Sequence, residues 1–245
     1  MLTRQISEKY TQNCLICLKI GDKYSAEYVN NLYHAVRKQS GDDFICFTDD
    51  ARGIDPGVIC LHMEPRQCEG WKHLWCKIMM YGREELIRYN KKVFFDLDIV
   101  IHGDITPILE HDCEWAMIRC KWKGIVFRTN NPKIPYMNSS CMVWKDNRWI
   151  YNKFQSDWKN ICKNYPGNDV WYHNCNIKPT PLPDVFYSYR EGSKPSHYWE
   201  NNYQPHFEYQ PDHAVCLFHQ KPEIHDLDKE NILYRIWNGN STQQK

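Results

Sequence analysis

The sequence has no long apolar run and no excess of one kind of charge. No segment approaches the roughly 20 apolar residues that a membrane-spanning helix needs, and residues 1–9 hold no apolar stretch typical of signal sequences. The 31 Lys and Arg against 30 Asp and Glu leave a net charge of +1, too little to attract nucleic acid or an anionic membrane surface. We therefore expect a cytoplasmic protein with no transmembrane segment and no nucleic-acid partner.

Disulfide cross-links are not expected either, although cysteine is abundant. Several of the 12 cysteines, such as Cys46 and Cys216, lie in apolar stretches of a chain that is too long to need covalent cross-links. Cys14 and Cys17 are three positions apart in an expected strand, so they face opposite sides and do not suit a zinc or redox pair. We expect buried, reduced thiols.

What the chain does contain is an alternation of strand and helix patterns. Its 245 residues suit one sizeable α/β domain, which we expect to span residues 1–245. A buried strand at 13–19 is followed by a helix at 26–39, which Ser25 can cap, and by a second strand at 44–47. This order places ligands at the carboxyl edge of an open sheet.

Further elements are expected along the rest of the chain. The patterns predict strands at 58–61, 114–119, 125–127, 136–144 and 214–218, and helices at 71–88, 149–161 and 168–172.

The most informative stretch is residues 92–101, a run of β-branched and aromatic residues interrupted by Asp96 and Asp98. We expect one buried strand, in which both carboxylates point to the same side. Burying two carboxylates is costly unless a cation or dense hydrogen bonding satisfies them, and a divalent metal ion is the simplest explanation. Alternatively, one aspartate caps a turn and the other is solvated.

Other polar residues are expected near the same edge of the sheet. Asp49 and Asp50 follow the second strand, where an acid often contacts a ribose or base, although turn formation explains them equally well. Lys77 is either a solvated helical lysine or a contact to a diphosphate. His219 ends a buried strand and precedes Lys221; one imidazole with two carboxylates suits Mn²⁺ or Mg²⁺, although a strand-end histidine is commonly just hydrogen-bonded.

The joint order of these pieces resembles a known family. The segments that carry the resemblance are Gly21-Asp22-Lys23-Tyr24, Tyr28-Val29-Asn30, Phe47-Thr48-Asp49-Asp50, Gly53-Ile54-Asp55-Pro56-Gly57, Trp75-Cys76-Lys77-Ile78, Phe95-Asp96-Leu97-Asp98, Asn138-Ser139-Ser140 and Phe218-His219-Gln220-Lys221-Pro222. Together they resemble small bacterial and phage-type glycosyltransferases of GT-A fold, related to the glycogenin and galactosyltransferase-like group. The resemblance implies a Rossmann-like single domain, whose mixed, mostly parallel central sheet is flanked by helices.

The resemblance also implies a chemistry. The donor is expected to be a nucleoside-diphosphate sugar, a UDP- or GDP-sugar, and the acceptor a glycan. Asp96, Asp98 and His219 are the expected ligands of Mn²⁺ or Mg²⁺. The expected contacts to the donor are Asp49, Asp50, Lys77, Asp96 and Lys221. Asn138 is expected to line the donor pocket, where it is a catalytic candidate beside Asp169.

Simpler explanations remain open for both catalytic candidates. Turn chemistry alone explains Asn138, and a helix cap alone explains Asp169. The chain also departs from the family pattern in two places. The central glutamine of the family's Gly-(Asp/Asn)-(Gln/Asp) element is missing at residues 167–169, and the residue after the late histidine is Gln220 where glycine is common.

Two other functions fit parts of this pattern. A sugar-phosphate nucleotidyltransferase ordinarily has a glycine-rich, basic loop after its first strand, for which residues 21–23 are too sparse. A non-catalytic sugar-binding protein would instead hold a structural Ca²⁺ at Asp96 and Asp98. Metal-dependent binding of a nucleoside diphosphate separates these alternatives from a glycosyltransferase.

Overall fold

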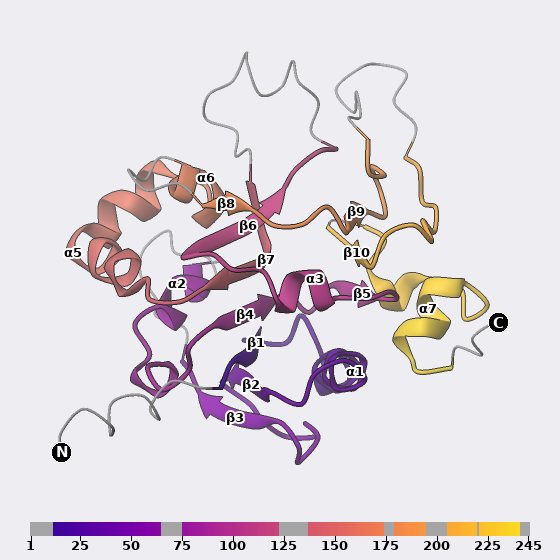
Figure 1. The fold of residues 1–245 in the computed structure, drawn as a ribbon, viewed down its shortest axis with the longest axis horizontal. Helices are drawn as coiled ribbons and strands as arrows, with labels where there is room; N and C mark the ends of the chain where they lie inside the picture. Colours follow the sequence, from indigo (N-terminus) through magenta and orange to yellow (C-terminus); the bar gives the residue numbers. More distant parts are fainter. Residues whose placement is uncertain are drawn as a thin grey trace.

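Two β-sheets form the frame of the molecule (Figure 1). The computed structural model describes residues 12–64, 75–122, 137–173, 179–194, 205–219 and 221–240. The larger sheet has the strand order β3-β2-β1-β4-β7-β6-β8, and the smaller has the order β5-β10-β9. Their strands are β1 Cys14–Lys19, β2 Asp43–Thr48, β3 Ile59–His62, β4 Lys92–Phe95, β5 Ile99–Ile101, β6 Trp115–Arg119, β7 Met137–Trp144, β8 Thr180–Pro181, β9 Phe186–Ser188 and β10 Val215–Leu217.

The larger sheet is mixed and mostly parallel, which confirms the predicted α/β class. β1 pairs in parallel with both β2 and β4, β3 pairs in parallel with β2, and β8 pairs in parallel with β6. β7 lies between β4 and β6 and is antiparallel to both. Because β1 to β4 run in one direction, the residues that follow them gather at one carboxyl edge of the sheet.

Alternating side chains of β1 enter different apolar cores. Leu15 and Cys17 of β1 pack in the core shared with β5 and β10, whereas Cys14 and Ile16 pack in the core on the other face. All four side chains are buried, at 1% exposure or less. The expected separation of Cys14 and Cys17 is therefore confirmed, and the ten described cysteines are all free thiols.

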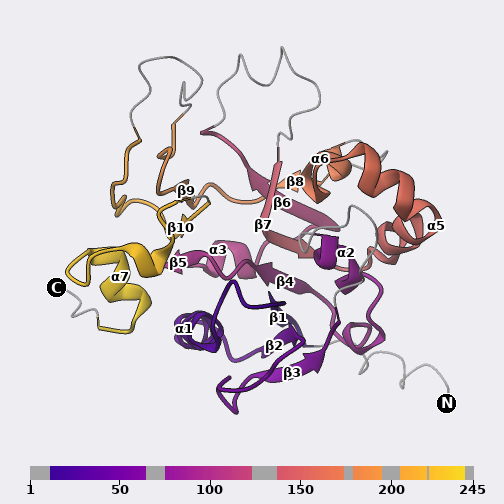
Figure 2. The same ribbon diagram turned by 180° about the vertical axis from the view of Figure 1, so that it is seen from behind.

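Helices cover both faces of the larger sheet (Figures 1 and 2). On the face toward the smaller sheet lie α1 Ala26–Arg37, α3 Thr106–Leu109, the 3₁₀ turn η3 Ile224–Asp226 and α7 Ile232–Trp237; on the other lie α2 Cys76–Met80, α5 Arg148–Asn164 and α6 Asn168–His173. The predicted helix at 26–39 matches α1; Ser25 is its N-cap residue, but its side chain makes no capping hydrogen bond. Within the described ranges, no helix combines the length and apolar character that crossing a bilayer requires.

The prediction of one continuous strand over 92–101 is wrong. β4 ends at Phe95 in the larger sheet, and β5 begins at Ile99 in the smaller one. β5 pairs antiparallel with β10, so the chain passes from one sheet to the other through residues 96–98. Both halves are apolar because each is buried in its own sheet, which made the whole stretch resemble one strand.

The predicted helix over 71–88 is also too long. Among the described residues, α2 ends at Met80, and only the short 3₁₀ turn η2 Glu84–Leu86 follows. The chain turns at Gly82, where a Cβ atom would lie 2.6 Å from the Tyr151 ring, and Arg83 has an extended backbone. Glycine is a weak helix former, and here its missing side chain leaves room for that ring. The strand predicted at 125–127 lies outside the described residues.

Candidate functional site

Asp96 and Asp98 lie in the turn that joins the two sheets. The Asp96 backbone N–H donates to the Ser140 carbonyl oxygen at 2.8 Å, and the Phe218 N–H donates to the Asp98 carbonyl oxygen at 2.8 Å. One aspartate is thus anchored to β7 of the larger sheet and the other to the end of β10 in the smaller. Both carboxylates lie at the carboxyl end of β4, which is where ligands bind in open α/β sheets.

Lys77 of α2 reaches this turn from the opposite face of the sheet. Its Nζ lies 2.7 Å from Asp96 Oδ2, and the two side chains are 13% and 21% exposed. The same Nζ donates to the backbone oxygen of Ser139 at 3.4 Å and to its Oγ at 3.3 Å. Lys77 therefore joins Asp96 to β7, and the structure brings two of the predicted donor-binding residues into direct contact.

An irregularity in β7 places Ser139 and Ser140 at the site. Met117 of β6 pairs with Met142 of β7, but the next residue, Ile118, pairs with Asn138, so the register shifts between them. Bulges of this kind redirect side chains and are common beside active sites. Here the shift frees Ser139 to contact Lys77 and allows the Ser140 carbonyl oxygen to accept from Asp96.

Residues at the start of α6 also contact Ser139. The Ser139 N–H donates to Asp169 Oδ1 at 3.2 Å, and Asn168 Nδ2 donates to Ser139 Oγ at 3.2 Å. Asn138 makes a local contact, in which its Oδ1 accepts from the Ser140 N–H at 2.9 Å. A continuous chain of polar contacts thus runs from Asp96 through Lys77 and Ser139 to Asp169.

Tyr24, in the loop after β1, contacts Asp98 from the other side. Its hydroxyl group donates to Asp98 Oδ2 at 3.0 Å and lies 3.5 Å from Glu223 Oε2. Glu223 is only 7% exposed and forms an ion pair with Lys23, whose Nζ lies 3.3 Å from Glu223 Oε1. We assigned no role to these residues from the sequence, although loops that follow parallel strands are where such contacts are expected.

Electrostatics make this pair of carboxylates a good site for a cation. Burial raises the pKa of Asp98 to about 6, the charge of Asp96 adds to that rise, and Lys77 and Lys23 oppose it. Burial and the Asp98 charge also raise the pKa of Tyr24. The negative charge around Asp98 is thus incompletely neutralised, and a divalent ion would offset it.

The two carboxylates are suitable ligands for a hard divalent cation. In the described part of the chain, no three His, Cys, Asp or Glu side chains gather into a metal-binding group. Mg²⁺ and similar ions are commonly held by one or two carboxylates, with water and substrate phosphates completing the coordination shell. Asp96 and Asp98 match that pattern.

His219 directly follows Phe218, whose N–H binds Asp98, but the contacts of the His219 ring are with other residues. Its Nε2 lies 2.9 Å from Ser188 Oγ and 3.8 Å from Glu191 Oε1, and the ring stacks on Trp122. Its Nδ1 is buried, with no hydrogen-bond partner among the described residues. The structure does not group His219 with Asp96 and Asp98, and its role as a metal ligand stays a prediction.

The remaining predicted donor contacts make local interactions. Asp49 Oδ2 accepts from the Gly21 N–H at 2.9 Å and so ties the loop after β1 to the end of β2. Asp50 pairs with Arg52 at 2.7 Å, and Lys221 pairs with Asp226 at 2.8 Å. Their contacts to a donor stay predictions.

The mixed sheet and the second small sheet, joined through residues 96–98, match the GT-A fold of solved glycosyltransferases. Solved structures agree. The galactosyltransferase LgtC, in complex with donor and acceptor sugar analogues, aligns over 95% of this chain and 97% of its own at a TM-score of 0.62 and 12% identity.

Two larger proteins share the fold over part of their length. The glycosyltransferase GlyE of Streptococcus pneumoniae TIGR4 aligns at a TM-score of 0.61 and 11% identity, and this chain spans 60% of it. The bifunctional glycosyltransferase WbbM aligns at 0.59 and 10% identity, and this chain spans 49% of it. No protein-family model and no curated protein sequence matches the chain.

Proposed function

We propose that this protein is a metal-dependent glycosyltransferase that moves a sugar from a nucleoside-diphosphate sugar to a hydroxyl group of a glycan or another acceptor. The observation that carries the proposal is the pair Asp96 and Asp98, which the backbone fixes at the carboxyl end of β4 beside Lys77. The shared fold with LgtC, solved with donor and acceptor sugar analogues, supports the same class of reaction.

Asp96 and Asp98 are the residues that would hold Mn²⁺ or Mg²⁺. When bound, such an ion neutralises the charge that grows on the departing diphosphate. His219 is the candidate third ligand, because its buried Nδ1 has no partner among the described residues. Tyr24 orients Asp98 through the hydrogen bond from its hydroxyl group.

Lys77 supplies a fixed positive charge beside the carboxylates. Its contacts with Asp96 and Ser139 hold the ammonium group in place before a donor binds. A charge that is already positioned stabilises a developing anion without further reorganisation. We assign to Lys77 a contact with the donor diphosphate.

Asp169 and Asn138 are the candidates on the acceptor side. Asp169 is tied to Ser139, and through it to Lys77, so its carboxylate lies beside the donor residues. In an inverting enzyme this carboxylate would accept the proton of the acceptor hydroxyl group. In a retaining enzyme that base is dispensable, and Asp169 would instead position the reacting sugar.

Titration calorimetry with UDP and GDP, each with and without Mn²⁺, tests the proposal. We expect one nucleotide to bind only when the metal is present, and the corresponding nucleotide sugars to be hydrolysed slowly without an acceptor. Binding of a nucleotide that does not depend on metal contradicts the metal site. Binding of glycans without any nucleotide, together with Ca²⁺, would instead support a sugar-binding protein.

A further inference from the structure

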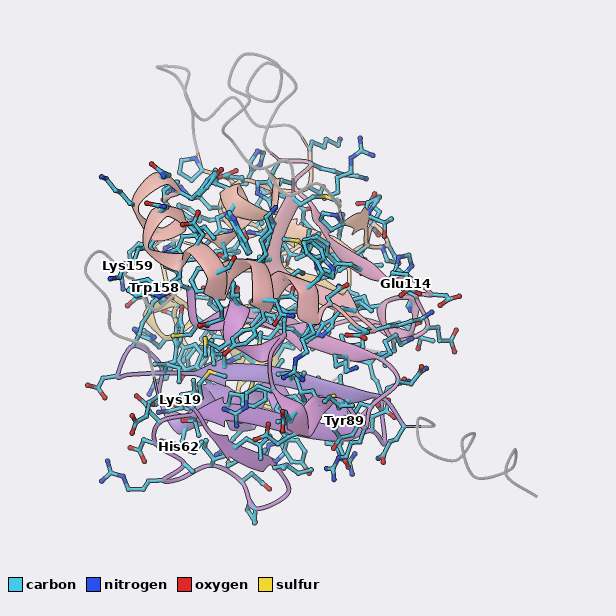
Figure 3. The ribbon with its side chains drawn as sticks, turned by 90° about the vertical axis from the view of Figure 1, so that its left-hand side faces the viewer. Lys19, His62, Tyr89, Glu114, Trp158 and Lys159 are labelled. Atoms are coloured by element: carbon cyan, nitrogen blue, oxygen red, sulfur yellow. The ribbon has the colours of Figure 1, made fainter. Side chains whose placement is uncertain are left out.

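A cavity lies at the opposite end of β4 from the proposed active site. It has a volume of about 340 Å³, and its walls come from the α2–η2 segment, the start of β4, and residues 144–148 at the end of β7. Figure 3 shows Tyr89 on one side of the molecule, whereas Lys19 and His62, at the carboxyl ends of β1 and β3, lie on the other. Lys92 and Asp96 are four positions apart, about 13 Å along an extended chain.

Lys92, which lines this cavity, is a buried cation without a counter-ion. It is 7% exposed, and its Nζ donates to the Lys145 carbonyl oxygen at 2.6 Å. Among the described residues no carboxylate lies within ion-pair distance of it. Asp146, on the same wall, accepts from the Arg148 N–H at 3.4 Å and acts on Lys92 only from farther away.

The other cations of the wall already have acidic partners. Arg83 pairs with Glu85 at 2.6 Å, Lys145 with Asp112 at 2.8 Å, and Arg148 with Glu84 at 3.6 Å. Burial lowers the pKa of Lys92, the change expected of an ammonium group that is removed from water without a partner. A buried charge of this kind is costly unless an opposite charge approaches it.

Apart from these cations, Asp146 and the amides of Asn90 and Asn147, the wall consists of aromatic and other apolar residues. Tyr89 and Trp144 are each 2% exposed and Leu86 is 3% exposed, whereas Ile87 is 49% exposed among the lining residues. A cavity that combines apolar walls with one unpaired cation suits an amphipathic ligand rather than a bare ion.

We propose that this cavity binds a small organic anion, whose charged group pairs with Lys92 and whose apolar part packs against the exposed Ile87 in the cavity wall. No residue assigned to sugar transfer lines the cavity. The inference therefore stands independently of the proposed function.

Calorimetry with phenyl phosphate, and with phenol as its uncharged counterpart, tests the site. We expect phenyl phosphate to bind with one site per chain and phenol to bind far more weakly. Lys92→Met keeps the length and apolar stem of the side chain but removes its charge, and should weaken binding of phenyl phosphate at least about tenfold. The titration is repeated in Asp98→Asn, where binding should persist, because a phosphate could otherwise occupy the donor site.

A second variant covers the case in which Lys92→Met fails to fold. Ile87→Glu places a negative charge on an exposed lining position and should weaken phenyl phosphate about threefold or more. Its matched control is Ile232→Glu on α7, at a residue that is 47% exposed and outside the cavity lining. The proposal is overturned if phenyl phosphate shows no saturable binding, or if its binding is lost in Asp98→Asn. It is also overturned if a folded Lys92→Met binds phenyl phosphate with unchanged affinity, or if the two glutamate variants have equal effects.

Discussion

At Asp98 the proposed role in metal binding and the stability of the fold oppose each other. Its pKa in the folded protein is raised from 3.8 to about 6, so the native state binds more protons than the unfolded chain between these values. Stability contributed by the protonated group is therefore lost as pH rises through about 6. Because the Asp98 side chain is only half-buried, water screens its charge, and the loss of folding stability at neutral pH is about 1 to 2 kcal/mol.

Asp98→Asn should remove this cost together with the activity. At neutral pH the metal-free variant is expected to melt a few degrees above the metal-free wild type, whereas the two should converge below pH 3.8. Mn²⁺ should raise the melting temperature of the wild type but not of the variant. Thermal melts over a pH series, with parallel transfer assays, measure these effects; full activity in the variant would exclude Asp98 from the mechanism.

Lys77→Met should slow transfer and also lower stability. The pair with Asp96 is largely buried, so removing the cation should cost about 1 to 3 kcal/mol of folding stability, and loss of a positioned charge typically lowers kcat about 10²-fold to 10³-fold. The control is Lys159→Met, an exposed lysine on the outer surface of α5 (Figure 3), which should leave activity unchanged. Steady-state kinetics on both variants decide whether Lys77 acts on the diphosphate.

At the scale of elements, the break after α2 depends on one glycine. A Cβ atom at Gly82 would lie 2.6 Å from Tyr151 ring atoms, whereas a Cβ at Gly41 would meet nothing within 4 Å. Gly82→Ala should therefore destabilise the fold by about 1 to 3 kcal/mol, and Gly41→Ala should not. Urea denaturation compares the two, and equal stabilities would show that α5 moves aside freely.

Local patterns predicted the elements that are buried on one face. The helical spacing of Tyr28, Val29, Leu32 and Val36 identified α1, and all four side chains are buried. The division of 92–101 between two sheets could not be predicted, because the contacts that divide it come from distant residues. Ser140 and Phe218 bind the backbone of Asp96 and Asp98, and neither partner is visible in the local sequence.

Part of the candidate site, like part of the fold, could be predicted from the sequence. The Asp-x-Asp motif, Lys77 and Asp169 carry strong side-chain chemistry at expected sheet edges, and the structure brings them together. Tyr24 and Glu223 are ordinary residues of short loops, 199 positions apart. Tyr24 lies in one of the segments that carry the family resemblance, but its convergence with Glu223 on Asp98 follows from the packing of η3 near α1, which the local sequence does not predict.

At the scale of the whole molecule, burial protects most of the thiols. Eight of the ten described cysteines are buried, and Cys60 and Cys113 are half-buried. Burial raises the pKa of Cys76 to about 11, which leaves little reactive thiolate. Brief treatment of the native protein with iodoacetamide, followed by peptide mass spectrometry, should find Cys60 and Cys113 modified before the other eight; early modification of Cys17 or Cys141 would contradict the structure.

The turn at residues 96–98 connects the two sheets through its main chain and forms the proposed metal site through its side chains. These two roles use different atoms, because the contacts with Ser140 and Phe218 involve only backbone groups. Replacing the carboxylates therefore leaves the connection between the sheets intact. One substitution at either carboxylate would therefore remove half of the proposed metal site and leave the architecture unaltered.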